Sequence, residues 1–165
     1  PEPFSVLSLP IPSGSVEQSL YNCIELYCKK EEMVDDNAWF NDKLNKKQNV
    51  NRGIIFWSLP EILIIDLKRW GDRGQKIHTL VNVPTTDADF TKYVQGYNKE
   101  TFIYDLFGVY NHSGGSLGGH YTACIKNANG KWYEFNDTFV KEISESDIIS
   151  TQSYCFFYRK KKISQ

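Results

Sequence analysis

In the first third of the chain, apolar residues recur every three or four positions, which is the spacing of one face of a helix. Ser15 and Gln18 have the spacing of a capping box, the side-chain pair that closes a helix N-terminus. We therefore predict an amphipathic helix of about 15 residues that begins at Ser15 and ends near the charged run 29–32. Its apolar stripe comprises Val16, Leu20, Cys23, Ile24 and Tyr27.

Short apolar runs and two-residue alternation, both typical of β-strands, dominate the rest of the chain. The continuous apolar run 62–65 predicts a strand that is buried on both faces. Strands are predicted over residues 54–57, 62–70, 104–111, 120–127, 131–136 and 153–159, with a further extended segment over 76–83. The pattern thus predicts an α+β domain dominated by antiparallel sheet.

The segments between these elements are polar or rich in glycine. We expect a turn at 71–74, a polar connection at 85–101 and a loop at 112–119. For two segments the sequence does not decide the secondary structure. Residues 1–14 fit a strand or an extended arm, and residues 35–52 fit either strands or a turn-rich excursion.

The hairpin before and after Gly130 has two possible registers. It can turn through the two residues 129–130, or through the three residues 128–130 with Gly130 in the left-handed conformation. The three-residue loop pairs residue 127 with 131 and sorts apolar from polar side chains more cleanly, so we favour it. His120 and Asn136 then become diagonal neighbours on one face, with Cβ atoms about 7–8 Å apart.

A histidine beside an asparagine has a specific chemical use. An amide oxygen that accepts from one imidazole nitrogen fixes the tautomer and leaves the other nitrogen free as a base. This is the His–Asn half of a Cys-His-Asn arrangement, although such neighbours are more often a simple polar pair. Cys124 does not complete it, because four residues along a strand place it about 13 Å from His120.

Composition narrows the classes of function. The formal net charge is −1, which gives no strong attraction to nucleic acid or to a membrane surface. No apolar run approaches the roughly 18 residues of a membrane span, and no signal peptide is recognisable. The four cysteines match no metal-binding spacing, and we interpret them as buried free thiols of a reducing compartment. We expect no cofactor, no nucleic-acid partner and no membrane partner.

Four ordered segments resemble ubiquitin-specific proteases. Residues 104–114 and 118–123 (YDLFGVYNHSG and GGHYTA) are similar to the family's histidine box, and residues 131–140 (KWYEFNDTFV) to its continuation. Residues 58–70 (SLPEILIIDLKRW) resemble its L-P-x-x-L-x-x-x-L-K-R-F segment, and residues 3–12 resemble the start of the same half. The resemblance covers nearly the whole chain and identifies residues 1–165 as the C-terminal part of such a catalytic domain.

The resemblance implies a papain-like fold, of which this chain supplies the palm and reduced fingers. It implies hydrolysis of the bond after the C-terminal glycine of ubiquitin, with ubiquitin and ubiquitinated proteins as partners in the cytoplasm or nucleus. His120 would be the general base, Asn136 would orient it, and Asp137 would support the site or the oxyanion.

The same resemblance gives the glycine-rich stretch a role in binding. It corresponds to a loop that borders the channel for the ubiquitin tail, so Gly118, Gly119 and Tyr121 are candidate substrate-binding residues. Glycine lets an extended peptide approach the backbone closely. A plain flexible connection is the alternative.

Two family features are missing from this sequence. No segment resembles the N-terminal box with the nucleophilic cysteine, so we expect the chain alone to be inactive and to need the N-terminal half as a partner. Asn41 and Leu44 stand where a CxxC pair would begin a zinc site, so we expect no structural zinc. The chain begins at Pro1 without a methionine, and we expect an excised part of a longer protein.

Two functions remain in competition at this point. Either the parent protein is an active deubiquitinase, or it is a catalytically inactive module that binds ubiquitin or scaffolds a complex. The presence of His120, Asn136 and Asp137 favours the enzyme.

Overall fold

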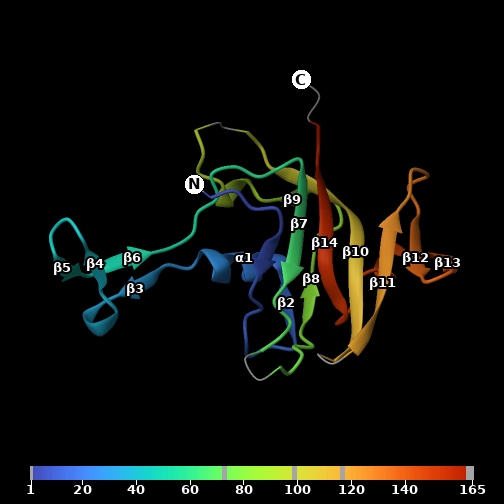
Figure 1. Ribbon diagram of the computed structural model, residues 1–165. Helices are drawn as coiled ribbons and strands as arrows, with labels where there is room; N and C mark the ends of the chain where they lie inside the picture. The colour runs from blue at the N-terminus through green and yellow to red at the C-terminus, as the bar shows by residue number, and fades with distance from the viewer. Residues whose placement is uncertain (1, 72–73, 98–99, 116–117, 163–165) are drawn as a thin grey trace.

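One eight-stranded sheet organises the structure. A computed structural model describes residues 2–71, 74–97, 100–115 and 118–162 (Figure 1). The strand order is β1-β7-β14-β10-β11-β12-β13, with β9 beside β10; β1 pairs with β7 in parallel and the other pairs are antiparallel. The strands are β1 (Leu7–Leu9), β7 (Ile62–Leu67), β9 (Ala88–Asp89), β10 (Ile103–Gly115), β11 (Gly118–Lys126), β12 (Trp132–Asn136), β13 (Phe139–Ile143) and β14 (Ser153–Lys160). The fold is α+β and papain-like, as predicted.

The predicted helix corresponds to α1 (Leu20–Cys28), which begins later than predicted. Residues Glu17–Ser19 form strand β2, which pairs in parallel with β8 (Leu80–Asn82). Ser19, and not Ser15, caps the helix, because its side chain accepts a hydrogen bond from the Asn22 amide. Val16 is 87 % exposed and lies outside the helix. Strand pairing therefore overrode the local capping signal.

The core lies on one face of the sheet. Strand β7 and its neighbour β14 direct alternate side chains into it, and α1 contributes its apolar stripe. Its central members include Leu20, Ile24, Leu63, Ile65, Leu67, Phe156 and Tyr158, each at most 2 % exposed. On the opposite face of β7, Ile62 is 41 % exposed. The prediction that this strand is buried on both faces is therefore wrong.

An arm of short strands projects from this body (Figure 1). It contains the pair β3 (Glu31–Met33) and β6 (Val50–Arg52) and the pair β4 (Trp39–Asn41) and β5 (Lys46–Gln48). A 3-10 turn, Asp35–Asn37, joins the two pairs. Residues 35–52, for which the sequence allowed either strands or a turn-rich excursion, thus contain short strands. At the first CxxC position, Asn41 donates to Gln48 at 2.7 Å instead of presenting a thiolate.

Several other boundaries differ from the sequence-based expectation. Residues 54–57 form no strand, and Phe56 makes only one isolated bridge, to Val94. The expected loop 112–119 is largely strand, because β10 continues to Gly115 and β11 starts at Gly118; residues 116–117 lie outside the described residues. Strand β13 was not predicted, and the connection 85–101 contains β9 and a 3-10 turn, Thr91–Tyr93. Among the described residues, no helix is both long and apolar enough to span a membrane.

Candidate functional site

The hairpin between β11 and β12 has the predicted three-residue loop. The Asn127 amide donates to the Lys131 carbonyl at 2.9 Å, and Gly130 has φ +80°. Lys126 pairs with Trp132 across the strands. A left-handed conformation costs little for glycine, so this residue fixes the register of the two strands that carry the candidate site.

His120 and Asn136 meet as that register requires. Nε2 of His120 lies 2.7 Å from Oδ1 of Asn136. An amide oxygen can only accept, so Nε2 carries the proton and donates it. Nδ1 of His120 is then the unprotonated nitrogen of a neutral ring, and the side chain is 48 % exposed. The arrangement provides a fixed imidazole with a nitrogen available for proton transfer.

Asp137 joins the same corner of the sheet. It follows β12 with φ +50°, in the tight turn that lets Asn136 pair with Phe139. Its Oδ2 atom lies 4.0 Å from Nε2 of His120, and its side chain is 77 % exposed. The carboxylate is thus a charged neighbour of the imidazole and not its close hydrogen-bond acceptor, a position that Asn136 occupies.

A polar network that sequence reasoning missed supports the His120 face. Asn111 of β10 pairs with Thr122 of β11, and its amide nitrogen lies 3.5 Å from the Thr122 hydroxyl. Ser153 of β14, which is fully buried, donates to the Asn111 amide oxygen at 3.1 Å. The network ties three adjacent strands together two residues after His120. The only sequence signal for this network was the position of Asn111 within the segment that resembles the histidine box.

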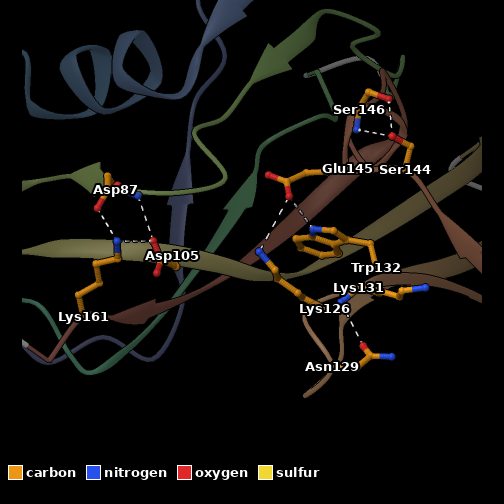
Figure 2. A network of polar contacts seen from close by, with 10 residues as sticks. All are labelled: Asp87, Asp105, Lys126, Asn129, Lys131, Trp132, Ser144, Glu145, Ser146 and Lys161. Atoms are coloured by element: carbon orange, nitrogen blue, oxygen red, sulfur yellow. Dashed lines mark hydrogen bonds and ion pairs between the residues drawn. The ribbon is translucent and has the colours of Figure 1, made fainter.

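The far end of the hairpin is fixed to the 3-10 turn Glu145–Asp147 (Figure 2). The Trp132 indole, 3 % exposed, donates to a Glu145 carboxylate oxygen at 3.3 Å. Lys126 lies 3.9 Å from the same oxygen and 5.8 Å from the centre of the Trp132 ring. A hydrogen bond from Thr85, together with the one from Trp132 and the charge of Lys126, lowers the pKa of Glu145. These contacts attach the first residue of β12, the strand that ends at Asn136, to the turn.

The glycine-rich hairpin lies beside His120. Gly114 has φ +104°, and Gly118 and Gly119 are exposed at the start of β11. Tyr121 is 60 % exposed. The three predicted substrate-binding residues therefore lie on one strand with His120 and are open to solvent, as an extended ligand would require.

The four cysteines all have a raised thiol pKa. All are free thiols, and Cys23, Cys124 and Cys155 are buried. Burial raises the pKa of Cys23 to about 11 and, with the charge of Asp66, that of Cys155 to about 12. Burial also raises the pKa of Cys28 and Cys124. Because the thiolate is the reactive form, a raised pKa disfavours reactivity of each of these thiols.

A family model and several known proteins match this sequence. The family model described as ubiquitin carboxyl-terminal hydrolase matches residues 14–158. Ubiquitin carboxyl-terminal hydrolase 5 of Arabidopsis thaliana is 39 % identical over 87 % of this chain, and ubiquitin carboxyl-terminal hydrolase 15 of Rattus norvegicus is 37 % identical over 86 %. The chain spans only 16 % and 15 % of their lengths.

Solved structures show the same likeness. The SAGA DUB module of Ubp8, Sgf11, Sus1 and Sgf73 bound to ubiquitin aldehyde contains a chain that matches with a TM-score of 0.78 and 29 % identity. The match covers 96 % of this chain and 36 % of that one. A related module with shortened Sgf11 gives a TM-score of 0.80 and 30 % identity over 98 % of this chain and 36 % of the other.

Proposed function

The chain belongs to the ubiquitin carboxyl-terminal hydrolase family, within it to the ubiquitin-specific proteases, and on this premise we propose that it supplies the base of a cysteine-type deubiquitinase. In this proposal, residues 1–165 are the C-terminal part of the catalytic domain. The observation that carries it is the 2.7 Å contact between His120 and Asn136, which leaves Nδ1 of His120 free.

The proposed reaction is hydrolysis of the bond after the C-terminal glycine of ubiquitin. A cysteine from the preceding half gives its thiol proton to Nδ1 of His120, and the thiolate attacks the scissile carbonyl carbon. The imidazolium then protonates the leaving amine, and a thioester to the cysteine forms. His120 next takes a proton from water, which attacks the thioester and releases the ubiquitin carboxylate and the thiol.

The two partners of His120 have different proposed roles. Asn136 fixes the ring orientation and the tautomer through its accepting oxygen. Asp137, at 4.0 Å, favours the imidazolium that forms during the reaction. Its high exposure limits that contribution, because water screens charges at the surface.

The start of β11 is the proposed path of the ubiquitin tail. Gly118 and Gly119 leave the backbone accessible, and Tyr121 offers an exposed ring beside it. Ubiquitin and ubiquitinated proteins are the proposed partners, and the solved relative bound to ubiquitin aldehyde supports this. The unpaired cysteines support a reducing, cytoplasmic or nuclear, location.

We also propose that the chain alone is inactive and packs against the cysteine-bearing half of its domain. The raised pKa of each of its own thiols supports this, because it disfavours the thiolate. In addition, the His120 side chain, which has to meet that cysteine, is 48 % exposed and therefore accessible to a second part of the domain.

The test compares this chain with the same protein extended upstream to include the cysteine-bearing half. With a fluorogenic ubiquitin C-terminal amide as substrate, only the extended protein should hydrolyse, and its His120→Ala variant should not. Activity of the 165-residue chain that depends on His120 would contradict the proposal. An extended protein that binds ubiquitin without cleaving it would support the inactive-module alternative instead.

A further inference from the structure

His112 lies in the interior of the glycine-rich hairpin, against the backbone that leads to His120. It pairs with Tyr121 across β10 and β11 and is 6 % exposed. A Cβ atom added to Gly119 would lie 2.2 Å from Nε2 of His112 and 2.4 Å from the carbonyl oxygen of Ser113. The ring therefore occupies the space beside residue 119, and only glycine permits this close approach.

Lys76 fixes the orientation of that ring. Its ammonium group lies 3.2 Å from Nδ1 of His112 and also donates to the main-chain oxygen of the same residue. An ammonium has no acceptor, so Nδ1 must accept and the proton of the neutral ring is on Nε2. The Trp70 ring lies edge-on to the His112 ring, with a centroid separation of 5.8 Å and an interplanar angle of 65°. The imidazole is thus held by a donor, an aromatic ring and the strand backbone.

The electrostatic surroundings of His112 favour its neutral form. Burial and the charge of Lys76 lower the pKa of His112. Burial and the charge of Arg69 lower that of Lys76. Tyr121 from β11 and Tyr154 from β14 also face the ring, with centroids at 4.6 Å and 6.5 Å. A neutral acceptor is the form that the Lys76 contact requires.

We propose that His112 is a positioning residue for His120, acting through Gly119. The neutral ring, held by Lys76, fixes the position of the backbone at Gly119. The side chain of the next residue, His120, can then reach Asn136. His112 touches neither the scissile bond nor the nucleophile in this scheme. The inference rests on the proposed function only because it takes His120 as the base. The effect of His112 on the position of the His120 ring can be tested without measuring activity.

The test uses nitrogen NMR on the 165-residue chain labelled in its three histidines. His112→Phe keeps a ring but removes the acceptor, and Lys76→Met removes the donor while leaving the ring. Both variants should move the ring-nitrogen signals of His120, and Lys76→Arg, which keeps a donor, should move them less. His78→Gln is the matched control, because His78 is exposed and should leave them unchanged.

The outcomes separate this inference from the proposed function. Asn136→Ala should move the His120 signals in any case. If it does but neither His112→Phe nor Lys76→Met does, the positioning role is wrong and the proposed function stands. Should His112→Phe fail to fold, Lys76→Met decides alone. In the extended protein, Lys76→Met should lower kcat about tenfold while KM changes little, since small misplacements of a catalytic group are costly; an unchanged kcat would overturn the inference.

Discussion

His120 and Asn136 are 16 residues apart in sequence, yet their side chains meet at 2.7 Å. The separation is bridged by a hairpin whose three-residue loop ends in Gly130 at φ +80°. A loop shorter by one residue would direct one of the two side chains to the opposite face of the sheet. The candidate site therefore depends on a turn far from the chemistry as much as on the two residues themselves.

Replacement of Asn136 tests the orienting role. We predict that Asn136→Ala, in the protein extended to include the nucleophile, lowers kcat by about 100-fold, because the imidazole loses its tautomer and orientation. Asn136→Asp keeps an accepting oxygen and should retain more activity. Steady-state kinetics on both variants provide the check, and equal losses would argue against a role for the acceptor.

Replacement of Asp137 tests the smaller, electrostatic role. The charge is 4.0 Å from the imidazole and highly exposed, so Asp137→Asn should lower kcat by a factor of about five or less. Added salt should lower the kcat of the wild-type enzyme until it approaches the kcat of the variant, because salt screens the charge. Asp42→Asn, an exposed acid on the projecting arm, is the control. A loss as large as that of Asn136→Ala would show that the carboxylate, not the amide, orients His120.

The loop that sets the register can be tested by stability. Gly130→Ala should lower the free energy of unfolding by about 1 kcal/mol, because an L-residue is strained at positive φ. A Cβ atom there would meet nothing within 4 Å, so the cost is one of backbone conformation alone. Gly115→Ala, also in open space and without a positive φ, is the matched control. Equal urea-unfolding curves for the two variants would contradict this account of the loop.

The buried thiols predict loss of stability in alkali. In the unfolded chain Cys155 titrates near its ordinary value of 9.0, whereas folding raises its pKa to about 12. Between these values only the unfolded state loses the proton, so the free energy of unfolding falls as pH rises above about 9. Urea unfolding across this range should show a shallower fall for Cys155→Ala than for wild type. Identical slopes would show that folding does not raise the pKa of this thiol.

The sequence predicted the register of the β11–β12 hairpin better than the boundaries of the elements around it. Gly130 and the alternation of apolar and polar side chains were sufficient for the register, because both act locally on one hairpin. The helix start was misplaced because Ser15 and Ser19 offer similar local caps, and only the distant pairing of Glu17 with Leu80 decides between them. Local patterns do not contain that information.

The surroundings of the site were missed for the same reason. Lys76 contacts His112 from 36 positions away, and no periodicity links the two. The glycine-rich stretch was taken for a loop because of its composition, although β10 and β11 continue through most of it. Its glycines relieve crowding between paired strands, as Gly119 does beside His112.

The protonation state of His120 in the wild-type chain tests the central claim most directly. Nitrogen NMR of the histidine-labelled chain above its titration range should show a proton on Nε2 and none on Nδ1, with the Nε2 signal lost or shifted in Asn136→Ala. That result would establish a ring that presents Nδ1 to an incoming thiol. The arrangement on which the proposed chemistry depends would be contradicted by a proton on Nδ1. It would also be contradicted by a His120 signal that is the same in Asn136→Ala as in the wild-type chain.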